Sequence, residues 1–163
     1  MATWNDAYST QINDHRLMDF NDFEWHDSVI RNIRIDRNRP GEQDTIEFEV
    51  EFDSGLFRIV FESVYQASFQ MNFGVRVEDE TIYYAFTEGR ENKMVQDFYS
   101  LWNGLFDKVN LNYYEIETNS TGSKFQIVAM GVSFFEMERQ NSIMKRIGDK
   151  LIACKWYAKL KRK

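Results

Sequence analysis

The sequence predicts an α+β fold: a mostly antiparallel sheet of about six or seven strands, with one amphipathic helix and a C-terminal helix packed on one face. Two observations lead to this prediction. Apolar and polar residues alternate with a period of two in several stretches between Val29 and Phe86, which is typical of strands with one buried face. After Glu91 the period becomes that of an amphipathic helix, which would cover the apolar face of the sheet.

The first three strands follow from alternation and turn chemistry. Residues 29–36 alternate in polarity and predict a strand. Arg-Pro-Gly at 39–41 predicts a turn after it, because proline fixes φ and glycine accepts a positive φ. Residues 45–52 read Thr-Ile-Glu-Phe-Glu-Val-Glu-Phe and predict a strand with one apolar and one acidic face. Asp-Ser-Gly at 53–55 is short enough to join that strand to residues 57–62 as an antiparallel hairpin.

Two further strands and a helix are expected next. Residues 65–75 continue the alternation and predict a fourth strand, and residues 82–86 predict a brief fifth one. Apolar residues at helical spacing between Met94 and Leu105 predict a helix of about four turns that lies over the apolar face of the sheet. In this register one set of side chains is buried together: Ile46, Phe48, Val50, Phe69 and Met71.

The remaining elements are a second hairpin and the two ends of the chain. Residues 111–118 and 124–135 predict a hairpin, and its second arm is apolar on both faces, which is typical of a central strand. Apolar residues at helical spacing within 143–151 predict the C-terminal helix. Residues 1–24 are polar with scattered aromatic side chains and predict a short helix or loop packed on the sheet edge.

Length and composition bound the class of protein. The chain of 163 residues predicts a single domain over 1–163, and 43% hydrophobic residues with one proline favour a packed sheet over disorder. One cysteine, Cys154, excludes an intramolecular disulfide, and with two histidines it leaves no set of ligands for a structural zinc. We therefore predict no metal and no cofactor. The absence of a secretion-type leader and of a long apolar run predicts a cytoplasmic protein without a membrane span.

Charge is divided unevenly along the chain. The formal net charge is −6, but residues 139–163 hold nine Lys or Arg and one Asp, so this segment carries +8 and the remainder −14. A basic helix could contact nucleic acid or anionic lipid. The acidic remainder opposes both partners, and cations near a helix C-terminus also favour the helix dipole. The charge pattern thus favours a basic protein partner over nucleic acid.

Trp25-His26-Asp27-Ser28 brings a base, a carboxylate and a hydroxyl together. An imidazole oriented by a carboxylate is a catalytic arrangement, but adjacent strand residues point to opposite faces, which separates His26 from Asp27. The structural interpretation is favoured: Asp27 or Ser28 bonds to backbone where the strand begins, Trp25 packs, and His26 is bonded locally. In it His26 is partly buried, with no other titratable side chains around a shared open pocket.

Glu47, Glu49 and Glu51 lie on one face of a predicted strand. Carboxylates at this spacing could converge on a cation or on the basic surface of a partner. The loop carbonyls and Asp or Asn clusters that usually complete a hard-metal site are missing. The open alternatives are a solvated strand face and an acidic docking face.

Phe23-Glu24-Trp25-His26-Asp27-Ser28-Val29-Ile30 resembles the opening of a group of small, uncharacterised bacterial proteins. Phe73-Gly74-Val75 and residues 114–120, Tyr-Glu-Ile-Glu-Thr-Asn-Ser, are similar to that group too. Some of its members are similar to immunity proteins encoded beside polymorphic toxins, which bind and block a cognate toxin. The resemblance implies protein binding without catalytic residues to carry over.

The sequence analysis therefore predicts a non-catalytic protein-binding domain, of the immunity type, whose partner is a basic toxin. No phosphate-binding Gly loop, His-Glu-x-x-His or Gly-x-Ser-x-Gly motif favours a familiar enzyme class. Two alternatives remain open. A small-ligand-binding module would need an apolar pocket with a few polar groups, and an enzyme would need His26 facing a cleft with a second titratable group.

Overall fold

The computed structural model describes residues 19–42 and 44–137. Within them six strands form one antiparallel sheet, which closes on itself as a barrel in the order β1-β2-β3-β6-β5-β4. The elements in chain order are the 3₁₀ helix η2 (Phe20–Asp22), β1 (Val29–Asp36), β2 (Thr45–Phe52), β3 (Gly55–Gln70), β4 (Glu80–Glu88), α1 (Lys93–Leu101), β5 (Asn112–Thr118) and β6 (Lys124–Met137). The predicted mostly antiparallel sheet with an amphipathic helix is confirmed. The predicted C-terminal helix lies outside the described residues.

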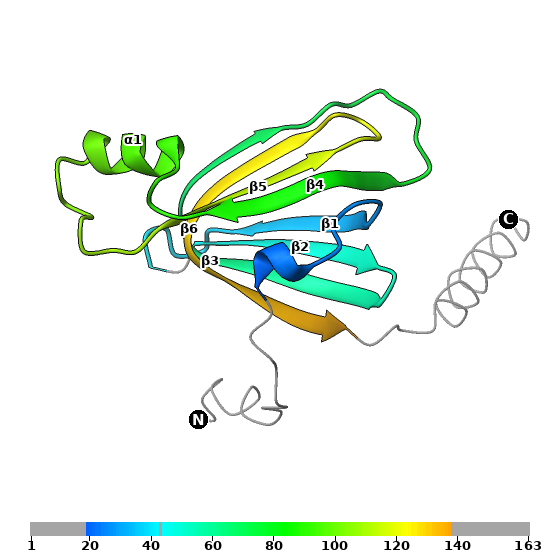
Figure 1. Cartoon of the computed structure of the whole chain (residues 1–163), viewed down its shortest axis with the longest axis horizontal. Helices are drawn as coiled ribbons and strands as arrows, with labels where there is room; N and C mark the ends of the chain where they lie inside the picture. The colour runs from blue at the N-terminus through cyan, green and yellow to red at the C-terminus, as the bar shows by residue number, and fades with distance from the viewer. Residues whose placement is uncertain (1–18, 43, 138–163) are drawn as a thin grey trace, which may run out of the picture.

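The apolar face of the sheet is covered by the opposite wall of the same sheet, not by helices. The ring of Phe48 on β2 lies 5.3 Å from that of Phe125 on β6 and 5.9 Å from that of Phe61 on β3. β3 and β6 are the longest strands and pair along nearly their whole length, with an irregularity between Val64 and Gln66. Because a bulge bends the strand that carries it, these two strands take part in both halves of the sheet (Figure 1).

Helix α1 packs on the outside of the barrel, at one end of the molecule (Figure 1). Val95 and Phe98 form a separate cluster with Leu111, Tyr113 and Val128, whereas the neighbouring Tyr114 and Ile127 face the core. The expectation that α1 covers the core face of the sheet is therefore wrong. The reason is that the core face is covered by the opposite wall of the closed sheet, which leaves the outer face for α1.

The helix is also shorter than its apolar stripe. It ends at Leu101, and both Asn103 and Gly104 have positive φ, 46° and 82°, which turns the chain out of the helical path. Leu101 and Leu105 are consequently 73% and 70% exposed. The predicted helix to Leu105 is wrong at its C-terminal end for this reason.

The predicted third and fourth strands are one strand, β3, which stops at Gln70. Ile46, Phe48 and Val50 are buried as predicted, and Phe69 packs against the core while staying partly buried. Met71 is 42% exposed, so its predicted burial is wrong. Beyond Gln70 the chain has no partner strand within the described residues, and the alternation continues without a core to face.

The turn after β1 and the segment before it were also predicted from the sequence. Arg39 accepts a backbone hydrogen bond from Glu42 at 3.0 Å, and Gly41 has φ of 83°, as expected for the predicted Arg-Pro-Gly turn. Phe20 and Phe23, from the part of residues 1–24 that the structure describes, insert into the barrel core. No helix among the described residues has the length and apolar character needed to cross a bilayer.

Candidate functional site

Trp25, Asp27 and Ser28 hold the entry to β1 in place. Trp25 is 4% exposed, and its indole Nε1 donates a hydrogen bond to the Phe20 carbonyl at 2.8 Å. The buried Ser28 hydroxyl donates to the Trp25 carbonyl at 2.5 Å. Asp27 adopts a φ of 65°, and its backbone N–H donates to the Ile82 carbonyl at 2.9 Å. These bonds fix the start of β1 against β4, and they leave the Ser28 hydroxyl engaged rather than free to react.

His26 differs from its predicted environment. Its side chain is 62% exposed, and Nδ1 lies 3.0 Å from an oxygen of Asp27. The predicted separation of His26 from Asp27 is wrong, because both residues lie in the turn before β1, where strand alternation does not apply. The pair faces a hollow of about 380 Å³ that carboxylates line, namely those of Asp22, Glu24, Asp27 and Asp53. The expected burial of His26 and the expected absence of other titratable groups around it are both wrong, because the β2–β3 turn brings Asp53 to this end of the barrel.

The hollow at His26 is acidic and suited to a cationic group. Glu24 and Asp53 form no hydrogen bond or ion pair within the part of the chain that the structure describes. That same part holds no group of three His, Cys, Asp or Glu side chains able to bind a metal ion. The chemistry available there is an exposed imidazole paired with a carboxylate, next to unneutralised carboxylates.

Glu47, Glu49 and Glu51 lie on the outer face of β2, as the alternation predicts, and arginines of the neighbouring strands share that face. In register, Glu47 lies opposite Arg34 of β1 and Glu49 opposite Arg58 of β3. Arg31 donates from Nε to Glu51 at 2.8 Å. The carboxylate row is therefore interleaved with cations instead of forming a purely acidic face.

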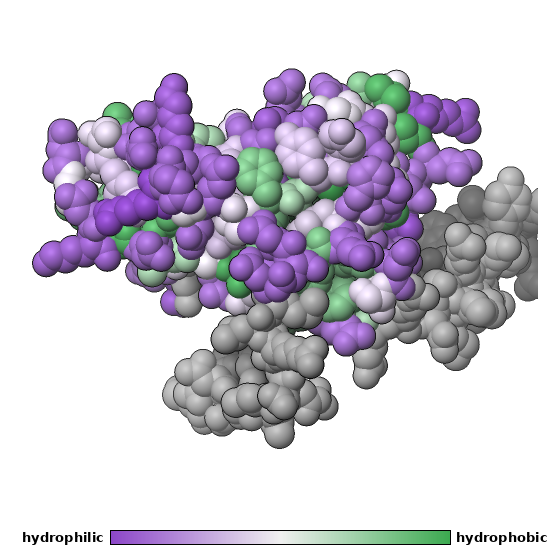
Figure 2. Space-filling model, in the orientation of Figure 1, coloured by the Kyte–Doolittle hydropathy of each residue, from purple (hydrophilic) through white to green (hydrophobic). Residues whose placement is uncertain are grey.

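Residues 71–77, Met-Asn-Phe-Gly-Val-Arg-Val, form an exposed apolar segment between β3 and β4. Phe73 is 83% exposed and Val75 56%, and Met71 and Val77 are 42% and 38% exposed. In Figure 2 hydrophobic side chains reach the surface at the upper right, where Figure 1 places the turn from β3 to β4. The segment lies at the opposite end of the molecule from α1 (Figure 1). The same alternation that predicted a buried strand here produces a projecting apolar surface.

Hydrogen bonds hold the chain at Asn72, inside the apolar segment, and at Glu80, three residues after it. Asn72 donates from its backbone to the Ser123 hydroxyl at 3.1 Å and from Nδ2 to the carbonyls of Thr121 and Gly122, each at 3.0 Å. The Thr121 hydroxyl donates to Glu80 at 2.5 Å. The tip of the β5–β6 hairpin therefore holds the chain on either side of residues 73–79, and Phe73, Val75 and Val77 between these anchors are exposed.

Acidic residues adjoin the apolar segment. Glu78, Asp79 and Glu80 follow it directly, and Arg31 forms ion pairs with both Asp79 and Glu51. Arg31 thus connects the segment to the carboxylate row of β2. Sequence reasoning identified the row but missed the segment, whose one local signal was Gly74, a residue with φ of 89° inside an otherwise strand-like pattern.

A buried carboxylate on the outer face of β5 has four side-chain partners. Glu115 is paired with Lys124 at 2.6 Å and accepts hydrogen bonds from Tyr84 at 2.8 Å, from Gln126 at 3.0 Å and from Tyr113. Burial opposes the charge of Glu115, but these four donors outweigh it and lower the pKa of the carboxyl group. Burial, together with bonding to carboxylates, raises the pKa of both tyrosines. The network joins β4, β5 and β6 beside α1.

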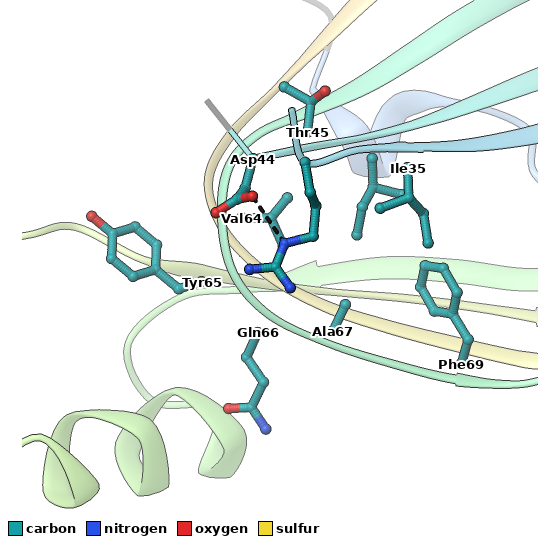
Figure 3. Close-up of a pocket in the computed structure, with 10 residues that line it drawn as sticks. Ile35, Asp44, Thr45, Val64, Tyr65, Gln66, Ala67 and Phe69 are labelled. Carbon is teal, nitrogen blue, oxygen red and sulfur yellow. Dashed lines mark hydrogen bonds and ion pairs between the residues drawn. The ribbon is translucent and has the colours of Figure 1, made fainter. Parts of the chain in front are cut away.

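The barrel is open at one mouth, between the ends of β1 and β2 and the second half of β3 (Figure 3). The opening is about 380 Å³ in volume and mostly apolar, and it is lined by Ile35, Arg37, Asp44, Thr45, Ile46, Val64, Tyr65, Gln66, Ala67 and Phe69. Arg37 donates from Nε to Asp44 at 3.1 Å at its rim. Ile35 of β1 and Phe69 of β3 both line the opening (Figure 3).

Comparison with protein-family models and with curated proteins gave no match to this chain.

Proposed function

We propose that the chain is a non-catalytic protein-binding domain whose docking surface is the apolar segment of residues 71–77 and the acidic residues beside it. The single observation that carries this proposal is the exposure of Phe73, 83%, in a loop that is held at Asn72 and at Glu80. A large exposed apolar side chain costs solubility and contributes nothing to the core. Such surfaces typically mark protein interaction sites.

Anchoring supports binding because it lowers the cost of association. Asn72 and Glu80 tie the chain on either side of residues 73–79 to the hairpin tip, which restricts this loop and lowers the conformational entropy lost when a partner binds. The alternation of Phe73 and Val75 presents side chains from an extended chain. A partner groove that accepts alternate side chains of an extended chain fits this shape.

Charge points to a basic partner. The described residues hold 22 Asp or Glu against 10 Lys or Arg, and Glu78, Asp79 and Glu80 follow the segment directly. A partner with an apolar groove and a rim of Lys or Arg would be steered toward this end of the molecule, and salt would slow the encounter. Neutralisation of a basic toxin, the role implied by the resemblance to immunity proteins, is the form of binding that we propose.

A capture experiment with matched variants tests the proposal. The full chain is immobilised and exposed to a lysate of its native host, and the retained proteins are identified by mass spectrometry. A Phe73→Ser/Val75→Ser variant removes the apolar segment, and a Leu101→Ser/Leu105→Ser variant removes a similar exposed apolar area at the other end of the molecule. All four side chains are exposed, so we expect each variant to fold, which a urea titration verifies.

We expect a basic protein to be retained by the wild type and by the Leu101/Leu105 variant, and to be lost from the Phe73/Val75 variant. The captured protein, once purified, should bind the Phe73/Val75 variant at least about tenfold more weakly, in line with the loss of one interface hot spot. Retention of the same proteins by all three baits would refute the docking segment. Recovery of nucleic acid in place of a protein would refute the protein-binding function.

The role of the carboxylate row in binding is tested by replacing glutamate with glutamine, because a charge reversal to lysine would also disturb the sheet. Lysines at 47 and 49 would stand opposite Arg34 and Arg58, where like charges destabilise the sheet. Glu47→Gln/Glu49→Gln removes the charges and keeps the shape, and it leaves the bond between Arg31 and Glu51 intact. If the row is part of the docking face, this variant slows association with the captured protein, while the loss of each cross-strand charge pair costs at most about 1 kcal/mol of stability.

The exposed pair of His26 and Asp27 favours a second candidate, an enzyme that uses His26 as a general base. The hollow meets the condition stated above for an enzyme, His26 facing a cleft with a second titratable group, and so raises this candidate. We place it second because the Ser28 hydroxyl, the nearest nucleophile in the sequence, already donates to the Trp25 carbonyl. A His26→Gln variant separates the two functions. Protein binding through residues 71–77 is unchanged by it, whereas a reaction that depends on the imidazole is lost.

A further inference from the structure

We propose that the open mouth of the barrel binds a small amphiphilic carboxylate, with its apolar body on the inner surface of β3 and its carboxylate on Arg37. The site is separate from the docking segment and does not depend on it. Its lining belongs to β1, β2, β3 and the loop between β1 and β2, and no residue of the segment 71–77 lines it.

The mouth is apolar because strands of unequal length leave core-facing side chains uncovered. β2 begins at Thr45, whose partner on β3 is Glu62, whereas β3 continues to Gln70. The side chains of Val64 and Phe69 beyond that point pack only partly against the core. Ile35, beside the buried Ile46 in the β1–β2 register, is 54% exposed. An inner barrel surface with this exposure is suited to an apolar ligand.

Arg37 supplies a cation with unused donors at the rim. Its Nε donates to Asp44, while its two terminal amino groups have no hydrogen-bond partner within residues 19–42 and 44–137. The second oxygen of Asp44 accepts a hydrogen bond from the backbone N–H of Gly41 at 2.8 Å. That bond and the one from Arg37 lower the pKa of Asp44, which therefore stays ionised and holds Arg37 in position. The free edge of the guanidinium fits a carboxylate through two parallel bonds.

The size of the opening selects a small molecule over a protein segment. A volume of about 380 Å³ lies in the range of about 300–1,000 Å³ that small-ligand pockets occupy, near its lower end. Arg37 is the one cationic side chain among the described residues that line it. Asp44, which also lines the opening, occupies only the Nε side of Arg37, so a single carboxylate on an unbranched or aromatic body would bind the two terminal amino groups.

Decanoate is the probe, and decanol, which has the same chain without the charge, is its matched control. The full-length protein labelled with ¹⁵N is titrated with each compound, and amide chemical shifts locate the binding site. We expect saturable one-to-one binding of decanoate, with shifts concentrated at Ile35, Val64, Ala67 and Phe69. Decanol should bind the same residues at least about tenfold more weakly, because it cannot form a charge-assisted pair with Arg37.

Variants assign the two parts of the site. Arg37→Gln should weaken decanoate about tenfold and leave decanol unchanged. Arg34→Gln is the matched control, since Arg34 is also an exposed arginine near the end of β1 and does not line the opening. Ala67→Trp fills the mouth from an exposed position on β3 and should abolish binding of both compounds.

The wild-type titration decides the proposal even if the tryptophan variant fails to fold. Shifts confined to the lining residues, together with a loss in Arg37→Gln but not in Arg34→Gln, support it. No saturable shift, shifts centred on the hydrophobic cluster of α1, or equal loss in both arginine variants would overturn it. Occupation of the mouth by another part of the chain would appear as no binding and would likewise overturn the proposal.

Discussion

Phe48 and Phe73 form a matched pair for testing how the barrel encloses its core. Both are phenylalanines in an alternating apolar pattern, but Phe48 is fully buried and Phe73 is 83% exposed. The ring of Phe48 contacts the rings of Phe61 and Phe125, which belong to β3 and β6, the two longest strands of the barrel. Replacing Phe48 by alanine therefore leaves a cavity between the two walls of the sheet.

The expected cost follows from that environment. Truncation of a buried phenylalanine to alanine costs about 3–5 kcal/mol through lost transfer free energy and the cavity that remains. With a urea dependence of about 2 kcal/mol per molar, an ordinary value for a small domain, a loss of about 4 kcal/mol lowers the unfolding midpoint by about 2 M. Phe73→Ala removes little buried area and should change the free energy of unfolding by less than about 0.5 kcal/mol.

The assay is urea denaturation of both variants, followed by tryptophan fluorescence. Trp25 is a suitable probe because its indole lies in the same core as Phe48. Equal midpoints for Phe48→Ala and Phe73→Ala would contradict the closed barrel and the exposed segment together.

Three further predictions concern other parts of the chain. The folded state lowers the pKa of Glu115 below its usual value near 4.5, so the stability that Glu115 contributes is present above that value and is lost as pH falls through the folded pKa. The free energy of unfolding, measured against pH, should therefore fall in acid for the wild type. It should fall more shallowly for Glu115→Gln, which has no carboxyl group to protonate at this position. Asp27 has φ of 65°, so Asp27→Ala should lower the free energy of unfolding by about 1 kcal/mol, while Asp27→Gly, which accepts that φ, should lower it less, and a steeper loss in Asp27→Gly would contradict the role of the backbone. The free energy of unfolding of Leu101→Ser/Leu105→Ser, measured by urea titration, should lie within about 0.5 kcal/mol of the wild-type value, since both side chains are exposed. A larger loss would mean that these side chains pack against the rest of the protein.

Local patterns predicted the strands whose structure depends on neighbours in sequence. β1 and β2 occupy residues 29–36 and 45–52, as the alternation indicates, and Asp-Ser-Gly at 53–55 joins β2 to β3. Period two and turn chemistry are properties of a few adjacent residues, so they can be read without knowing what the strands pack against.

Closure of the sheet could not be predicted in the same way. It depends on the short antiparallel pairing of β1 with β4, where Val29 lies opposite Thr81 and Ile30 opposite Glu80, and on a bend of β3 near Val64 that alternation does not mark. The position of α1 on the outer face of the barrel could not be predicted for the same reason. A helix stripe indicates that a face is buried, but it does not say which face of the sheet it meets.

The sequence pattern does not distinguish the docking segment from a buried strand, because apolar and polar residues alternate in both. Phe69 and Phe73 belong to one alternating series, yet the first packs against the core and the second projects into solvent. The difference arises where β3 ends and Asn72 bonds to the carbonyls of Thr121 and Gly122, residues about fifty positions away. Sequence reasoning found the carboxylates of β2 and the tetrapeptide at 25–28, but it could not assemble the hollow that Asp53 completes from another turn.

Hydrogen–deuterium exchange of the free protein and of its complex with the captured partner tests the central claim, that residues 71–77 form the docking surface. We predict slower exchange in the complex at 72–80, with no change in the helix Lys93–Leu101 or in the mouth of the barrel. Protection confined to the helix, to the hollow at His26 or to the mouth, with residues 72–80 exchanging as in the free protein, would contradict it.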